Sequence, residues 1–199
     1  LYVDSCEFSG GYYAMRSVVS ERDRTSGMYI TDNNIHNFWS TAVYFRKVND
    51  ISVRHNNIRG GVTTSARPLV GIQVAEVDGG INIERNNVVL FDNMNGGKKP
   101  IVVSNCVANN IDRGRVYNNM CVAQGTGTNG GASQGITIDS SAFINVYYNT
   151  VRVWGGANSP TTRSLSVQST SSAINVLNNI FANFSKGYAY WLNNMTNVA

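Results

Sequence analysis

The chain has 199 residues, of which 14% are charged, and its formal net charge at pH 7 is +4. Typical soluble domains are about 25% charged. Arg and Lys are scattered here without a basic run, which argues against a nucleic-acid partner. No apolar stretch approaches the roughly 18 residues that a membrane-spanning helix needs, so we expect no membrane insertion. The length suits a single domain with a sizeable core.

One frame of eight residues recurs along the chain. It reads apolar, any, apolar, any, polar, Asn, any, apolar, and its copies begin at Leu1, Met28, Ile51, Ile81, Gly114, Ile144 and Ile174. The first copy has Cys6 in the place of Asn, and Gly114 replaces an apolar residue in the fifth copy. Repetition with a period of roughly 20 to 50 residues is typical of solenoid proteins.

Each copy predicts a short β-strand with one buried face, because its apolar residues alternate. The polar–Asn pair that follows predicts a turn, since Asn tolerates left-handed backbone angles and bonds its own backbone. An Asn that points inward at every turn can hydrogen-bond the same Asn of the next coil, which would satisfy the buried amides. This predicted inward ladder consists of Asn33, Asn56, Asn86, Asn119, Asn149 and Asn179.

A second strand precedes most copies of the frame. These strands are marked by alternating apolar pairs: Val43 with Phe45, Ile72 with Val74, Ile101 with Val103, Ile136 with Ile138, and Leu165 with Val167. No stretch combines a helical apolar period with caps. One coil of strands cannot bury its own inner face, but stacked coils can. The sequence therefore predicts an all-β fold, a parallel β-helix of about seven coils in which residues 1–199 form a single domain.

Three of the repeats carry a family resemblance. Residues 51–58, 81–88 and 144–151 (ISVRHNNI, INIERNNV and INVYYNTV) resemble the coil consensus of the right-handed parallel β-helix proteins of the pectate-lyase-like superfamily. The last coil, residues 174–184 followed by 187–190, is similar to repeats of large surface proteins of Bacteroidota. These resemblances imply a bacterial protein that is secreted or lies at the cell surface. They also imply right-handed winding, which the crossover rule for parallel strands favours too.

The ends of the chain lack the pattern of a solenoid cap. Leu1 already lies in a predicted strand, and residues 188–192 look like the opening strand of another coil. Solenoids need caps, because end coils expose unpaired strand edges. We therefore expect an internal slice of a longer solenoid with both caps missing, and further coils of the same chain at both ends.

Outward residues at one frame position should form a column along the rod, with neighbours about 4.8 Å apart. One predicted column is Asp4, Thr31, Arg54, Glu84, Tyr117, Tyr147 and Leu177, and the other is Tyr2, Tyr29, Ser52, Asn82, Arg115, Asn145 and Asn175. Aromatic platforms flanked by amides and charges suit sugars. The carbohydrate-binding candidates are therefore Tyr117, Tyr147, Arg54, Glu84 and Arg115. An ordinary solvated sheet face with cross-strand pairs is the alternative interpretation.

The catalytic equipment that the resemblance would imply is not evident in the sequence. Pectate lyases hold Ca²⁺ with clustered acidic residues beside an Arg base, and Ca²⁺ needs about six or more oxygen ligands. Asp4 and Glu84 are separated in their column by Thr31 and Arg54, and Asp139 has no acidic neighbour in its own column. We therefore nominate no catalytic residue, metal site or cofactor, and expect Ca²⁺ only if the chain belongs to a lyase.

Cysteine, glycine and histidine patterns are equally sparse. Cys106 and Cys121 are interpreted either as buried small hydrophobic residues or as a disulfide across neighbouring coils. Residues 125–130 match Gly-x-Gly-x-x-Gly, but no helix follows, so a glycine-rich loop is expected. His36 and His55 are interpreted as turn residues that bond the backbone.

Three functional hypotheses remain open. The first is a structural or glycan-binding β-helix module of a large secreted or cell-surface, adhesin-like bacterial protein, with a polysaccharide or cell-surface glycan as its partner. The second is a fragment of a lyase, hydrolase or epimerase that acts on acidic plant or algal polysaccharide. The third is a trimeric phage or viral tail-spike segment. The missing catalytic clusters and the mostly polar outward columns favour the first.

Overall fold

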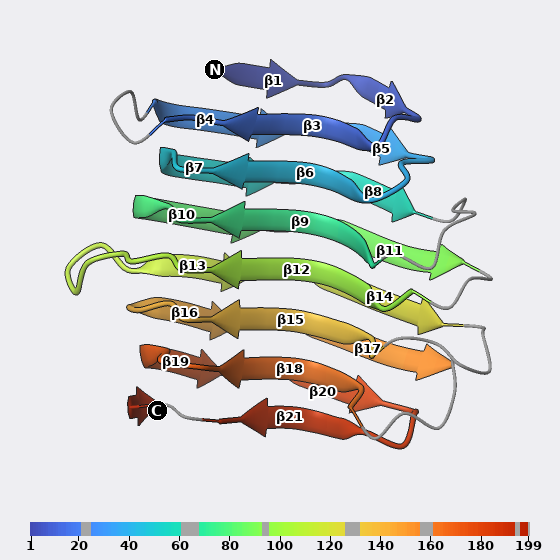
Figure 1. Cartoon of the computed structure of the whole chain (residues 1–199), viewed down its shortest axis with the longest axis vertical. Helices are drawn as coiled ribbons and strands as arrows, with labels where there is room; N and C mark the ends of the chain where they lie inside the picture. The colour runs from blue at the N-terminus through green and yellow to red at the C-terminus, as the bar shows by residue number, and fades with distance from the viewer. Residues whose placement is uncertain are drawn as a thin grey trace.

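The computed structural model describes residues 1–20, 25–60, 68–92, 96–125, 132–155, 161–193 and 196–198. In these residues it contains strands, turns and bends but no helix, and the strands form three parallel sheets stacked along one axis (Figure 1). Each coil gives one strand to each sheet in turn, so every sheet pairs a strand with strands from the preceding and following coils.

Sheet A holds the strands that the frame predicts, and sheet B holds the strands that follow the ladder turn. Sheet A contains β1 (Tyr2–Asp4), β4 (Ser26–Thr31), β7 (Asn49–Arg54), β10 (Asp78–Glu84), β13 (Gly114–Tyr117), β16 (Ile144–Tyr147), β19 (Ser172–Leu177) and β22 (Thr196–Val198). Sheet B contains β2 (Glu7–Ser9), β5 (Asn34–His36), β8 (Asn57–Gly60), β11 (Asn87–Asp92), β14 (Met120–Gly125), β17 (Thr150–Gly155) and β20 (Ile180–Asn183).

Sheet C completes each coil. It contains β3 (Tyr13–Val18), β6 (Thr41–Arg46), β9 (Leu69–Ala75), β12 (Lys98–Ser104), β15 (Gln134–Asp139), β18 (Arg163–Gln168) and β21 (Tyr188–Leu192). The right-handed parallel β-helix is thus confirmed, with one difference in extent. About seven coils are predicted, whereas the strands make about six turns, because the seven strands in each of sheets B and C are separated by six intervals.

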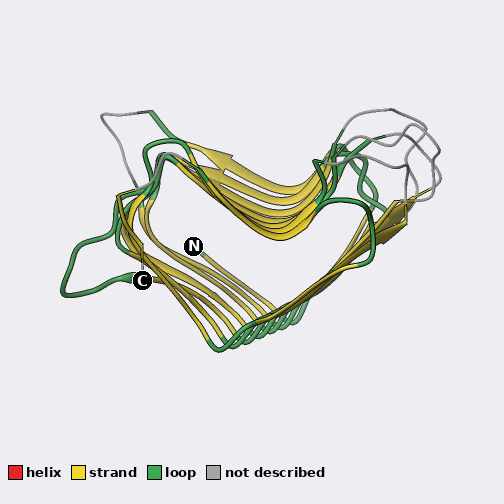
Figure 2. Ribbon diagram, turned by 90° about the horizontal axis from the view of Figure 1, so that it is seen from below, coloured by secondary structure: helices red, strands yellow, loops and turns green. Residues whose placement is uncertain are grey.

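The core lies between the three sheets and follows the axis of the rod (Figure 2). The second apolar position of the frame is almost fully buried in the central coils, where Ile30, Val53, Ile83, Val116 and Val146 are at most 1% exposed. Gly114, the exception to the frame, faces a larger neighbour: a Cβ at this position would lie 2.5 Å from Cδ1 of Ile144. Gly135 in β15 is more tightly enclosed, because a Cβ there would lie 2.2 Å from Cγ1 of Val151 and 2.5 Å from the backbone carbonyl oxygen of Ser164.

The predicted Asn ladder is confirmed at the corner between sheets A and B. Oδ1 of Asn56 accepts the backbone N–H and the side-chain amide of Asn33, both at 3.0 Å. The same pair of bonds links each successive ladder Asn as far as Asn179. Cys6 begins the series, since its backbone N–H donates to Oδ1 of Asn33 at 2.9 Å. Each buried amide therefore finds its partner one coil away.

The turn at this corner differs from the prediction in one respect. None of the ladder Asn residues has a positive φ; the residue before each of them does. These left-handed residues have φ between 52° and 57°, and they are Asp32, His55, Arg85, Asn118, Tyr148 and Asn178; Ser5, before Cys6, has φ 52° as well. A left-handed conformation costs a residue other than Gly roughly 1–2 kcal/mol, so side chains as large as Tyr148 are held there by the ladder bonds that follow. The turns stack in a row at the lower corner of Figure 2.

The three cysteines, the two histidines and the start of the Gly-rich segment lie within the described residues. Cys106 and Cys121 are buried and all three cysteines are free, so the disulfide does not form. His36 lies in β5 with Nε2 2.9 Å from Oε1 of Glu7, and His55 lies in a turn with Nδ1 3.8 Å from Oδ1 of Asp32. Only the first residue of the Gly-rich segment 125–130 lies within the described residues, as the end of β14.

Candidate functional site

The outward face of sheet A carries both predicted columns in register. Arg54 pairs with Glu84, Glu84 with Tyr117, and Tyr117 with Tyr147. The neighbouring column runs through Ser52, Asn82, Arg115, Asn145 and Asn175. Because parallel strands in register repeat about every 4.8 Å along the rod, residues at one frame position become direct neighbours. The five predicted carbohydrate-binding residues therefore belong to one face of the molecule.

A stacked pair of tyrosines lies near the middle of this face. The ring centroids of Tyr117 and Tyr147 are 5.1 Å apart and the rings are inclined by 17°. Tyr148, in the following turn, meets Tyr147 edge-on, with centroids 5.5 Å apart and an angle of 82°. Both stacked tyrosines are half-buried, so part of each side chain is accessible at the surface.

A hollow of about 260 Å³ adjoins the tyrosines. It is lined by Tyr147, Tyr148, Leu177 and three amide side chains, Asn145, Asn175 and Asn178. Oδ1 of Asn145 accepts from Nδ2 of Asn175 at 3.0 Å and from Nε of Arg113 at 2.7 Å. Arg113 also donates to the carbonyl oxygen of Ala173 and lies over the ring of Phe143. These contacts fix Asn145 and Asn175, so two of the three amides of this hollow are held in place before any ligand arrives.

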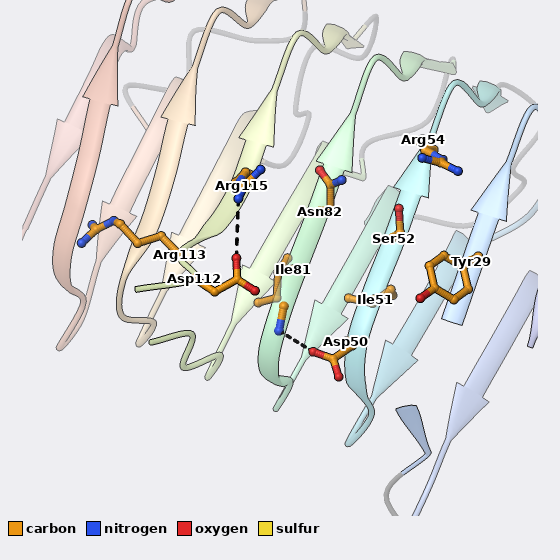
Figure 3. A pocket seen from close by; sticks show the side chains of 11 residues that line it. Tyr29, Asp50, Ile51, Ser52, Arg54, Ile81, Asn82, Asp112, Arg113 and Arg115 are labelled. Atoms are coloured by element: carbon orange, nitrogen blue, oxygen red, sulfur yellow. Dashed lines mark hydrogen bonds and ion pairs between the residues drawn. The ribbon is translucent and has the colours of Figure 1, made fainter. Parts of the chain in front are cut away.

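A second hollow, of about 330 Å³, lies further up the same face and is drawn in Figure 3. It spans β4 to β13, and its polar lining combines basic, acidic and neutral side chains: Tyr29, Asp50, Ser52, Arg54, Asn82, Asp112, Arg113 and Arg115. Oδ1 of Asp50 accepts the backbone N–H of Gly80 at 2.8 Å, and Oδ1 of Asp112 lies 3.5 Å from Nη2 of Arg115. The arginine-lined hollow and the tyrosine pair are thus adjacent parts of one surface.

The sequence candidates divide between these features. Arg54 and Arg115 line the second hollow, and Tyr147 lines the first. Tyr117 stacks on Tyr147. Glu84 is only 6% exposed and lines neither hollow. The carboxylate of Glu84 and the guanidinium of Arg54 belong to register neighbours, yet no ion pair within the described residues joins them.

Sequence reasoning missed Asp50, Asp112 and Arg113. All three lie outside the two columns, at the corner where sheet C leads into sheet A. Asp50 is the second residue of β7 and has φ 54°. Asp112 and Arg113 belong to the longer connection before β13, where the backbone N–H groups of Ile111 and Asp112 donate to Oδ1 of Asn109. One signal was available: the step from Asn86 to Asn119 is three residues longer than the steps on either side.

Other parts of the described surface add little chemistry. A hollow of about 310 Å³ lies on sheet C beside Tyr13, and an apolar hollow of about 430 Å³ lies at the end of the rod among Leu165, Val176, Phe181 and neighbouring residues. Within the described ranges, no three side chains of His, Cys, Asp or Glu gather closely enough to hold a metal ion. No helix among those residues could span a membrane.

Comparison of the chain with protein-family models, with curated proteins and with solved structures finds no match. The three parallel sheets show the parallel β-solenoid fold, and the resemblance to the pectate-lyase-like superfamily comes from the repeat frame alone.

Proposed function

We propose that this chain is a glycan-binding β-helix module of a secreted or cell-surface bacterial protein, with sheet A as its binding face. The observation that carries the proposal is the stacked pair of Tyr117 and Tyr147 beside a hollow in which Asn145 and Asn175 are held by hydrogen bonds. Pyranose rings have apolar faces that pack on aromatic rings, and their hydroxyl groups both donate to and accept from amides. A site with an apolar platform and a few positioned polar groups matches this chemistry.

The arrangement of the two hollows favours a linear ligand over a single sugar. Both hollows lie on sheet A, one reaching from β4 to β13 and the other formed by β16, β19 and the turns that follow these strands. Neighbouring strands are about 4.8 Å apart, so these strands offer equivalent contacts at nearly the length of one sugar unit. Each sugar of a polysaccharide that runs along the rod can therefore contact the next strand of sheet A.

A glycan array tests the proposal with Tyr147→Ala as the decisive variant. We expect the wild-type chain to bind a defined set of polysaccharides and Tyr147→Ala to lose at least about tenfold in affinity, since stacking on a ring contributes of order 1 kcal/mol beyond area burial. Tyr44→Ala is the matched control, because Tyr44 also stacks on a neighbouring tyrosine, Tyr13, at 5.7 Å, but on sheet C.

Two results would contradict the proposal. One is the absence of any glycan signal from the wild-type chain. The other is an equal loss of binding in Tyr147→Ala and Tyr44→Ala, which would show that sheet A is not the binding face. Thermal unfolding of each variant should accompany the array, so that a loss of binding can be separated from a loss of folded protein.

A further inference from the structure

We propose that the hollow between β7, β10 and β13 binds an anionic group of the glycan, a carboxylate or a sulfate, through Arg54 and Arg115. This inference rests on the proposed function and adds the class of ligand. The two guanidinium groups come from different strands and face one hollow from either side, with Asn82 between them (Figure 3). Two separated guanidinium groups form a site for an anion that lies between them, because each can donate paired N–H groups to its oxygens.

The guanidinium groups keep much of their capacity to donate. Within the described part of the chain, no hydrogen bond or ion pair engages the guanidinium of Arg54. Arg115 has one acidic contact, with Asp112 at 3.5 Å, and its side chain is 49% exposed. Arg113, the third arginine of the hollow, is already occupied by Asn145 and by the carbonyl oxygen of Ala173. Arg54 and Arg115 are therefore the groups available to a ligand.

The charges of the lining favour an anion over a cation. Three arginines face two aspartates in this hollow. One of these aspartates, Asp50, accepts a backbone N–H, and the other, Asp112, lies against Arg115. A cation would meet two carboxylates that already have partners and three guanidinium groups that repel it. An anion would instead accept hydrogen bonds from the guanidinium of Arg54, which no described residue engages.

Asn82 indicates that the anionic molecule also carries hydroxyl groups. Its Oδ1 is buried and has no hydrogen-bond partner, and a buried acceptor without a donor is costly. The side chain lies in register between Ser52 and Arg115. Asn82 lines the hollow, so a rotation of its side chain that brings Oδ1 to the surface would let a ligand hydroxyl donate to this oxygen while the acidic group of the ligand reaches the arginines. A sugar acid or a sulfated sugar carries both groups on one ring.

The hollow and the tyrosine pair can be reached by one ligand. Arg115 and Tyr117 belong to the same strand, β13, and are two residues apart on its outward face, which places their Cα atoms about 7 Å apart. A sugar packed on Tyr117 and Tyr147 would therefore have the acidic group of a neighbouring sugar within reach of Arg115. The anionic group would fix the position of the polysaccharide along sheet A, and the tyrosines would pack against its sugar rings.

Calorimetric titration with three oligosaccharides of equal length tests the inference: one with uronic acids, one sulfated and one neutral. We expect at least one anionic ligand to bind the wild-type chain about tenfold or more tightly than the neutral ligand. Arg54→Gln and Arg115→Gln should each remove most of this preference, because each lowers the affinity for the anionic ligand more than the affinity for the neutral one. Comparison of the carboxylated and sulfated ligands identifies which anion the hollow prefers.

Arg59→Gln is the matched control, because Arg59 lies in the same coil as Arg54 but on sheet B. It should keep the preference for the anionic ligand. Equal affinity for anionic and neutral ligands would overturn the inference while leaving the proposed function intact, provided that Tyr147→Ala still loses binding. A preference that survives both Arg54→Gln and Arg115→Gln would overturn it as well. Absence of binding to all three ligands would instead count against the proposed function itself.

Discussion

Oδ1 of Asn119 accepts both the backbone N–H and the side-chain amide of Asn86, each at 3.0 Å, although 33 residues separate the two asparagines. The bonds on the other side of Asn119, to Asn149, have the same lengths over a separation of 30 residues. The ladder geometry is therefore independent of how much chain lies between its members. It is set by the stacking of the coils.

The inward ladder should contribute more to stability than the hydrogen bonds between surface asparagines. Asn119→Ala removes the acceptor of two buried donors of Asn86, and we expect the free energy of unfolding to fall by about 2–4 kcal/mol, since each unsatisfied buried group costs roughly 1–3 kcal/mol. Asn57→Ala is the control, because Asn57 forms a similar series with Asn34 and Asn87 on the outer face of sheet B. Its loss should cost less than about 1 kcal/mol. Urea unfolding measures both, and equal losses would contradict the prediction.

The left-handed residue before each ladder Asn should reject β-branched side chains. Asn118 has φ 54°, and Asn tolerates this region, whereas Val does so poorly. We expect Asn118→Val to lower the free energy of unfolding by about 1–2 kcal/mol. Gln124→Val, on the outward face of strand β14, replaces a polar residue in extended backbone and should change stability by less than about 0.5 kcal/mol. Chemical unfolding that ranks Gln124→Val as the more damaging change would exclude this account of the turn.

Two glycines of the described strands should differ in their tolerance of alanine. A Cβ at Gly135 would lie 2.5 Å from the backbone carbonyl oxygen of Ser164, which cannot move without disturbing β18. At Gly114 the closest atom is Cδ1 of Ile144, the end of a flexible side chain. We expect Gly135→Ala to cost about 2 kcal/mol or more, as overpacking does, and Gly114→Ala to cost less than about 1 kcal/mol. Thermal unfolding of the two variants checks this order.

The three thiols should react at very different rates. Cys6 is exposed, whereas Cys106 and Cys121 are buried. Burial raises the pKa of the Cys106 thiol to about 11 and raises the pKa of Cys121 as well. Because the thiolate is the reactive form, an aromatic disulfide reagent at pH 8 should titrate one thiol in the native protein and three in urea. More than one fast thiol in the native state would contradict the burial of the other two.

The raised pKa of the Cys106 thiol should make the stability of the protein fall at high pH. The pKa of Cys106 is raised in the folded state, so above an ordinary thiol pKa of 9.0 the unfolded chain loses a proton that the folded chain keeps. The contribution of Cys106 is fully present below pH 9 and declines as the pH rises toward about 11. The free energy of unfolding of the wild type should therefore fall more steeply over this range than that of Cys106→Ala.

The sequence was most informative where one residue type repeats for one physical reason. The alternation of apolar residues predicted the strands of sheet A, and the repeated Asn predicted the ladder and the register that brings Tyr117 to Tyr147. Strand β3 was not predicted, because Ser17 stands where the second residue of the alternating apolar pair, such as Phe45 of β6, would be expected. The left-handed conformation was assigned to the ladder Asn, because Asn adopts it more readily than most residues. In the structure the residue before each ladder Asn adopts it instead.

The candidate site could be predicted only in part. Register follows from the repeat, so the columns of Arg54 and Arg115 could be placed on one face. Asp50, Asp112 and Arg113 complete the arginine-lined hollow from a corner whose path depends on local turns. The burial of Glu84 also depends on neighbouring side chains, which the frame does not specify. A repeat thus predicts which residues become neighbours, but not which of them face a hollow.

The three additional residues between Asn86 and Asn119 change the surface and leave the scaffold unchanged. In this architecture the corner between sheets C and A can accept an insertion without loss of register, so loop length and sequence can diversify there independently of the framework. For protein engineering, the exposed residues 109–112 are therefore a natural position for a randomised loop library, with selection for new ligands on an unaltered β-helix.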